Sequence, residues 1–212
     1  MAALCDYLEA EIIKHLCRTG SWTKPTTLAI ALIRATRGSW AAATVYAVND
    51  TVLPTTPNGR IYRATAISGT GTSAASEPTW PTTAAGTVVD NAGANQITWT
   101  EQTVQLEGGV FTEVANAGAY ARVSNNPLDA NWAAPSAGSG SGTAQTSNSG
   151  ALTYAAPTAN WGLVFGMIAL DSATYGAGNP QWYQALTNPK NINNGDAAPS
   201  FPASTLTFQI DN

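Results

Sequence analysis

The sequence predicts a mainly β protein: an antiparallel, jelly-roll-like β-sandwich with one N-terminal α-helix and an inserted small β domain. Three observations lead to this fold class. Short β-branched and aromatic stretches recur along the chain and are separated by Gly, Pro, Asn and Asp, as in antiparallel sandwiches. Only residues 3–18 have the apolar periodicity of a helix. Residues 38–103 have strand candidates, turn signals and aromatic residues of their own, which is typical of a separate β unit.

The helix predicted over residues 3–18 carries a single apolar stripe. Its acidic residues come early and its basic residues late, which suits the helix dipole. Gly20 is a suitable stop, and Pro25 forbids continuation. One helix beside a β domain either caps an open core or docks on a neighbouring subunit, and the sequence leaves both possibilities open. The stripe consists of Leu4, Cys5, Leu8, Ile12, Ile13 and Leu16.

The two cysteines, Cys5 and Cys17, are not expected to form a disulfide. If both lie on one straight helix, their spacing places them about 18 Å apart along its axis. That distance exceeds the roughly 7 Å between Cα atoms that a disulfide allows. We therefore expect two buried free thiols.

Two sections of the chain, residues 1–37 and 104–212, are expected to form one discontinuous β-sandwich domain, which we call the host. Residues 26–33 are apolar at successive positions, as in a strand buried on both faces. Residues 133–149 are rich in Gly, Ser and Ala, which predicts a flexible loop. Further host strands are expected at residues 119–124, 151–154, 162–170, 181–186, 191–192 and 206–210.

Residues 38–103, which we call the guest, are expected to form the inserted β domain. Asn58-Gly59 predicts a type I′ hairpin between its first two strands. A true insertion requires that the guest bury its own core, so removing it should leave a folded host. The guest strands are expected at residues 44–52, 61–66, 87–89 and 97–101.

Composition excludes several classes of partner. Charged residues make up only 10% of the chain, the formal net charge is -4, and the basic residues are scattered, so nucleic-acid binding is not expected. No apolar run approaches the roughly 18–20 residues that cross a bilayer, so no membrane partner is expected. The N-terminus lacks the pattern of a signal peptide, so we expect synthesis and assembly in a cytoplasm.

The residues required by common enzyme chemistries are missing. The single histidine, His15, lies in the predicted helix, far in sequence from a serine or aspartate partner for a nucleophilic triad. The Cys, Asp, Glu and His residues of that helix do not form a convincing zinc site. No two acids are spaced as a glycosidase pair. Gly138–Gly142 lacks the Lys-Ser/Thr of a phosphate loop. We therefore expect a protein that is not an enzyme, with no catalytic residue, cofactor or metal.

Aromatic residues of the guest are the remaining candidates for binding. Trp and Tyr rings stack on sugars and are enriched at binding sites. Trp80 lies between Pro78 and Pro81, which would hold it rigidly in a loop, and Tyr62 and Trp40 are further candidates for a glycan site. The alternative is that these rings form the core, because a small guest needs large aromatic residues to bury enough apolar surface.

Five segments of the host carry a family resemblance. They are HLCRTGSWTKPTTLAIAL, FTEVANAGAYARV, LDANWAAPS, QTSNSGALTYAAPTANWG and LTNPKNINNGDAAPSFPASTLTFQID. Through them residues 1–36 and 104–212 resemble a family of small tailed-bacteriophage virion proteins, of the tail-fibre-like or minor structural type. The resemblance implies a β-sandwich assembled into a virion, with no catalytic residues to transfer.

The guest interrupts the usual pattern of that family at Arg34–Arg37. It is similar to short modules of other phage structural proteins. Its segments YAVNDTV, NGRIYRAT, EPTWP and ITWTE also resemble small chitin-binding-type modules.

These observations lead to one main hypothesis and two alternatives. The main one is a capsid decoration or cement protein, a homo-oligomer whose host binds the major capsid protein and whose guest projects outward. It is favoured because the chain lacks coiled-coil heptads and fibre-type repeats. The first alternative is a tail or tail-fibre component that binds other tail proteins and host-cell surface carbohydrate. The second is a cell-wall hydrolase, for which no acid can be nominated.

Overall fold

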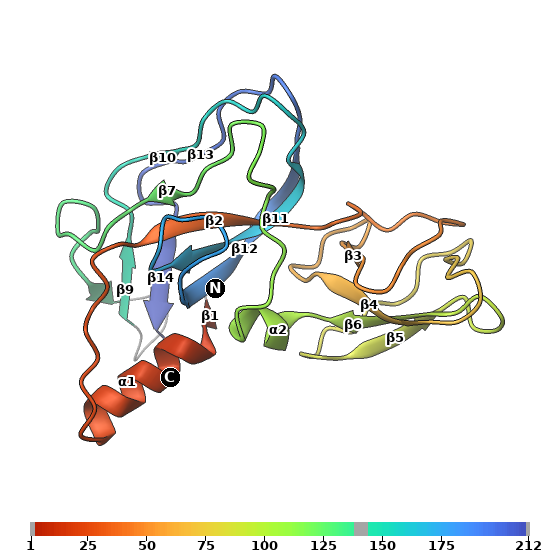
Figure 1. The fold of residues 1–212 in the computed structure, drawn as a ribbon, viewed down its shortest axis with the longest axis horizontal. Coiled ribbons are helices and arrows are strands. Elements are labelled where there is room, and N and C mark those ends of the chain that lie inside the picture. The colour runs from red at the N-terminus through yellow and green to blue at the C-terminus, as the bar shows by residue number, and fades with distance from the viewer. Residues whose placement is uncertain (1–2, 138–143, 211–212) are drawn as a thin grey trace.

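The computed structural model describes residues 3–137 and 144–210, and it confirms a mainly β fold with antiparallel sheets that fits a β-sandwich (Figure 1). The largest sheet belongs to the host, and its paired strands all run antiparallel. Figure 1 shows the guest extending to one side of it. The five host strands, in spatial order, are β1 (Ala3–Leu4), β12 (Pro180–Ile192), β11 (Gly162–Leu170), β2 (Ala29–Arg34) and β7 (Val123–Ser124).

Three smaller sheets complete the strands. The guest holds a four-stranded sheet in the order β3 (Thr51–Val52), β4 (Tyr62–Ile67), β6 (Ile97–Glu101) and β5 (Thr87–Asp90). The host adds a three-stranded sheet of β14 (Thr207–Ile210), β9 (Ala144–Ser147) and β8 (Ser136–Ala137). It also contains a pair formed by β10 (Leu152–Thr153) and β13 (Ser200–Phe201). The two helices are α1 (Asp6–Cys17) and α2 (Thr103–Glu107).

The central strands of the host sheet are buried on both faces, as the apolar run at residues 26–33 predicts. Ile30 and Leu32 belong to one apolar cluster, whereas Ala31 and Ile33 belong to the cluster on the other face. Alternating side chains of a strand point to opposite faces, so both faces of β2 must be covered. The first cluster is covered by the β10–β13 side of the host. The second is covered by α2 and by part of the guest.

The helix begins later than the sequence predicts. Ala3 and Leu4 form β1, which pairs with Tyr183 and Trp182 of β12, so residue 3 is not helical. Cys5 then caps α1, and its backbone nitrogen donates to the Gln181 carbonyl at 2.9 Å. The pairing of residues 3 and 4 with the distant strand β12 overrides the local helical periodicity. Periodicity within residues 3–18 carries no information about that pairing.

Much of the apolar stripe of α1 is exposed. Leu8 is the only buried residue between Asp6 and Cys17, while Ile13 and Leu16 are 57% and 75% exposed. The expectation of two buried thiols is wrong for Cys17, which is exposed, and right for Cys5; both are free, as expected. Only the first half of the helix packs on the host, because its second half extends away from the sheet (Figure 1).

Other host strands differ in length from the prediction. Residues 181–186 and 191–192 belong to one continuous strand, β12. The strand expected at 119–124 is reduced to Val123–Ser124. The loop expected at 133–149 contains β8 and β9, which pair with each other. A polar stretch rich in glycine can therefore still form hydrogen-bonded strands. Gly138–Gly142 falls within residues 138–143 and lies outside the described residues.

The guest has a core of its own, yet its first strand is short. Residues 44–50 are not in a strand, because Asp50 accepts a hydrogen bond from the Ala47 nitrogen and Asn49 has a positive φ of 75°. These features form a turn, so β3 begins only at Thr51. The core contains Trp40, Tyr46, Val52, Tyr62, Ala64, Ile97 and Trp99.

The hairpin prediction at Asn58-Gly59 is only partly right. β3 and β4 do pair antiparallel, with Val52 opposite Tyr62. The connection is too long for a two-residue hairpin, and of the two turn residues only Gly59 has a positive φ, so it is not a type I′ turn. Instead the Asn58 side chain accepts from the Arg60 nitrogen at 3.1 Å and donates to the Tyr62 hydroxyl at 2.8 Å.

Candidate functional site

Two of the three aromatic residues proposed for glycan binding are core residues. Tyr62 is 0% exposed and its hydroxyl donates to the Pro81 carbonyl at 2.7 Å. Trp40 is 6% exposed and its indole nitrogen donates to Asp90 at 2.8 Å. A ring that stacks on a sugar needs a free face. Among the three, only Trp80 is left with accessible ring surface, because it is half-buried.

Trp80 covers the guest core and is held rigidly there. Its ring centroid lies 4.4 Å from that of Tyr62 and 5.9 Å from that of Trp99. Its indole nitrogen donates to Glu77 at 2.7 Å, and the same carboxylate oxygen accepts from the Thr55 nitrogen at 2.8 Å. Both interpretations of Trp80 therefore have a physical basis, and glycan binding by this residue stays a prediction.

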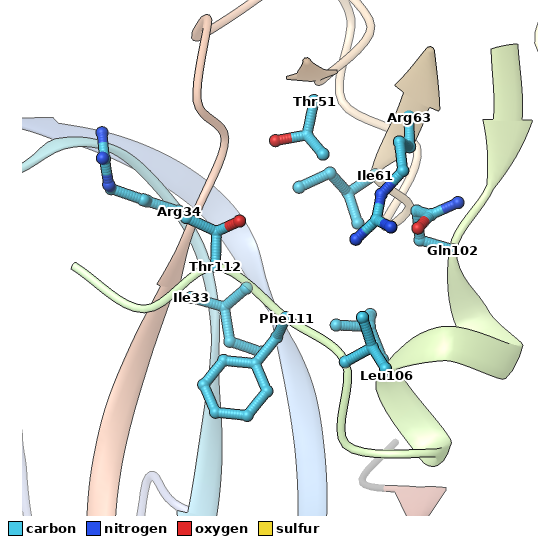
Figure 2. Close-up of a pocket in the computed structure, with 10 residues that line it drawn as sticks. Ile33, Arg34, Thr51, Ile61, Arg63, Gln102, Leu106, Phe111 and Thr112 are labelled. Carbon is cyan, nitrogen blue, oxygen red and sulfur yellow. The ribbon is translucent and has the colours of Figure 1, made fainter. Parts of the chain in front are cut away.

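The guest is joined to the host through apolar contacts. Leu53 and Ile61 of the guest are buried in the same cluster as Ile33 and Leu106 of the host. Figure 2 shows Ile61, Arg63 and Gln102 gathered near Ile33, Leu106 and Phe111, with the Arg34 side chain pointing away. The space between these side chains amounts to about 10 Å³, roughly one water molecule. The junction is therefore packed and leaves no room for a larger ligand.

An ion pair within the guest lies beside this junction. The Arg60 guanidinium donates from Nη1 to Glu101 Oε1 at 3.0 Å and to the Thr103 hydroxyl at 3.1 Å. Glu101 is 1% exposed, and its second oxygen accepts from the backbone nitrogens of Ala85 and Thr103, each at 3.0 Å. The buried carboxylate is thus fully hydrogen-bonded, as a buried charge must be. The contacts fix Arg60 against the start of α2.

Beside Arg60 lies an open polar cleft between guest and host. The turn at residues 58–60, α2 and β12 form its walls, and its volume is about 460 Å³. Sequence reasoning misses this cleft, because its walls come from three separate parts of the chain. Its lining consists of Ala3, Asn58, Gly59, Arg60, Thr103, Glu107, Tyr183, Gln184, Ala185, Leu186 and Thr187.

The titratable groups of the cleft are shifted by burial. Burial raises the pKa of the Glu107 carboxyl above its usual value of 4.5, and the negative charges of Asp6 and Glu9 raise it further. Burial also raises the pKa of Tyr183 to about 12, so its hydroxyl stays protonated near neutral pH. The cleft at neutral pH therefore contains one fixed positive group, Arg60, and one carboxyl group in a less polar setting than usual.

A second polar cluster in the host is saturated by its own members. Arg122 forms a two-pronged ion pair with Glu113, from Nε at 2.8 Å and Nη2 at 2.7 Å. The Tyr120 hydroxyl donates to the same carboxylate at 2.9 Å. Nη1 of Arg122 donates to the carbonyls of Ser172 and Ala177, which ties the loop between β11 and β12 to the core. This cluster holds a loop in place and leaves no free polar group for a ligand.

The described residues contain no candidate metal site and no candidate membrane-spanning helix. Within residues 3–137 and 144–210, no group of three or more His, Cys, Asp or Glu side chains is placed to hold a metal ion. His15 is exposed, and its Nδ1 accepts from the Trp22 nitrogen at 3.4 Å. In the same ranges no helix is long and apolar enough to cross a membrane.

The second section of the host is similar to a known protein family. Residues 100–209 match the family model described as Podophage GP4 fiber I protein gp80. The match starts at the end of β6 and runs through β14, so it covers the host after the guest and leaves nearly all of the guest outside. No curated protein matches the chain.

Proposed function

Because the chain belongs to the podophage GP4 fiber I protein gp80 family and is a structural component of a bacteriophage virion, we propose that it forms part of a fibre that contacts the host-cell surface. The observation that carries this proposal is the family match over residues 100–209. A fibre component fits that match at least as well as the capsid decoration protein favoured by the sequence. The match gives the decoration hypothesis no specific support.

The two parts of the chain suit two different tasks in such a fibre. The host would carry the contacts with neighbouring virion subunits, because it contains the matched residues. Its helix α1 supports this role, since Ile13 and Leu16 are exposed apolar residues on a helix held at its other end. The guest would project from the assembly, because its sheet extends to one side of the host in Figure 1.

A firm attachment makes the guest suitable for contact with a cell. The apolar contacts of Leu53 and Ile61 with the host, together with the fixed Arg60, favour a rigid junction over a flexible linker. A rigid mount lowers the entropy lost when a binding surface engages its target. The host-cell contact is therefore assigned to the guest and to the surface where it meets the host.

Copy number and location in purified virions test the proposal. Quantitative mass spectrometry should find far fewer copies of this chain than of the major capsid protein. Cryo-electron microscopy with an antibody fragment against the guest should place label on a fibre, and the same fragment should slow adsorption to cells. Label spread over the capsid, with a copy number close to that of the capsid subunit, would support a decoration protein instead and overturn the fibre proposal.

A further inference from the structure

We infer that the cleft between the guest turn at residues 58–60, α2 and β12 is a binding site for a neutral saccharide. This inference rests on the proposed function, because it names the ligand class and the place for the contact with the cell surface. It assigns that contact to residues other than Trp80.

The charged groups of the cleft favour a neutral ligand over an anion. Arg60 uses only Nη1 in the contacts with Glu101 and Thr103, so its other nitrogens can still donate. Glu107 makes no hydrogen bond or ion pair within the described residues, so its carboxylate can accept. Arg60 is already paired with the Glu101 carboxylate, and Asp6 and Glu9 lie near Glu107, so the net charge around the cleft is negative and disfavours an anionic ligand. A sugar hydroxyl both donates and accepts, and therefore suits a wall that offers both kinds of group.

Neutral polar groups on β12 add to this pattern. The side-chain oxygen of Gln184, which lines the cleft, is buried and has no hydrogen-bond partner in the described residues, so a small rotation of the side chain would be needed for a ligand to reach it; Thr187 is exposed. Leu186, Ala185 and Ala3 supply apolar surface beside them. Small-ligand sites commonly combine a few polar groups with an apolar wall that contacts the carbon faces of the ligand.

The walls of the cleft are rigid, which lowers the cost of binding. Tyr183 and Gln184 lie in a strand paired on one side with Ile168 and Met167 of β11. On the other side Tyr183 pairs with Ala3 of β1. Arg60 is fixed by a carboxylate that is itself buried. The volume of about 460 Å³ lies within the range of roughly 300–1,000 Å³ found for small-ligand sites, which often occur where two units of a chain meet.

Saturation-transfer difference NMR on the full chain tests the inference. The probes are glucose, galactose, rhamnose and N-acetylglucosamine, with glucuronic acid as a charged comparison. At least one neutral sugar should receive saturation and compete with a second one, and glucuronic acid should bind more weakly. Glu107→Gln and Gln184→Ala should each weaken binding about tenfold or less, as expected for the loss of one hydrogen bond.

Control variants separate this site from the alternatives. Glu9→Gln removes a nearby charge that does not line the cleft, and it should leave saccharide binding unchanged. Trp80→Ala should also leave it unchanged. Thermal unfolding of every variant distinguishes lost binding from lost folding, and Glu107→Gln conserves shape, so it should stay folded.

Two results would overturn the inference. One is the absence of saturation transfer to every neutral sugar of the panel. The other is binding that Trp80→Ala abolishes and Glu107→Gln leaves intact, which would assign the site to the guest loop. Either result leaves the fibre proposal standing if virion labelling places the chain on a fibre. Conversely, saccharide binding by a chain located on the capsid would overturn the fibre proposal alone.

Discussion

The Trp40 indole donates a 2.8 Å hydrogen bond to the carboxylate of Asp90 inside the guest. Asp90 is 2% exposed, and it also accepts from the Trp99 indole at 3.2 Å and from the Ala74 backbone nitrogen at 2.9 Å. One carboxylate therefore satisfies three donors from three separate segments, two of them on buried tryptophans. This network explains why the guest can bury Trp40 and Trp99 without leaving their N–H groups unpaired.

Replacing Asp90 should destabilise the guest strongly. In Asp90→Ala three donors lose their partner, two of them buried indoles, which we expect to lower the free energy of unfolding by about 2–4 kcal/mol. Asp90→Asn keeps an oxygen acceptor and should lose less. Urea unfolding followed by tryptophan fluorescence measures both. Asp129→Ala, at an exposed acid, is the matched control, and an Asp90→Ala variant as stable as that control would contradict the role of the network.

Removing the guest should damage the host, contrary to the expectation from sequence. Joining Arg37 to Val104 deletes Leu53 and Ile61, which are buried against Ile33 and Leu106. We expect the shortened chain to bind the dye ANS and to unfold at a lower temperature, because that apolar surface is no longer covered.

The point variant Ile61→Ala probes the same contact without a deletion. Truncating a buried isoleucine should lower the free energy of unfolding by about 2–4 kcal/mol. A shortened chain that unfolds cooperatively, binds no ANS and matches the full chain in melting temperature would show that guest and host are independent.

The exposed end of α1 should matter for assembly and not for folding. The double variant Ile13→Ser, Leu16→Ser changes only exposed side chains, so its free energy of unfolding should stay within about 0.5 kcal/mol of the wild-type value. Its incorporation into virions should fall, because neighbouring subunits would lose an apolar contact. Leu8→Ser, at the buried residue of the same helix, should destabilise the isolated protein. If the double variant is incorporated normally, the exposed end of α1 takes no part in the assembly contacts.

The raised pKa of Glu107 implies a pH-dependent contribution to stability. The folded protein holds this proton at a pH where the unfolded chain has already released it. The contribution of Glu107 to stability therefore declines as the pH rises from about 4.5 through the raised pKa. Glu107→Gln removes the charge, so its melting temperature should exceed that of the wild type at pH 7. The two should converge near pH 4. A difference of the same size at both pH values would contradict this origin.

Strands buried on both faces were the most predictable elements. The runs at residues 26–33 and 162–170 are apolar at successive positions, and both become central strands of the host sheet. Gly166 shows the limit of this reasoning. Next to it the pairing with β12 shifts from Val164 opposite Lys190 to Gly166 opposite Ala185, and a Cβ there would lie 2.6 Å from the Gln184 carbonyl oxygen. That requirement arises from a neighbouring strand and has no local signature.

The binding residues were less predictable than the strands. Aromatic content singled out Trp40, Tyr62 and Trp80, yet the first two are core residues. Nothing in the spacing of Arg60, Glu107 and Gln184 indicates a common cleft, because each lies on a different element of the fold. Composition identifies the kinds of residue that can bind a ligand, while the folded chain determines which of them meet.

Local periodicity and motifs along the chain were enough to predict the mainly β class, the positions of the long buried strands and the family resemblance of the host. The strand formed by Ala3 and Leu4, the exposure of Ile13 and Leu16 on α1, and the apolar contacts between guest and host became apparent only in the folded chain. All three features have the same cause. Strand pairing and burial are contacts between segments far apart in the sequence, and their free energies outweigh the local preferences from which such predictions are made.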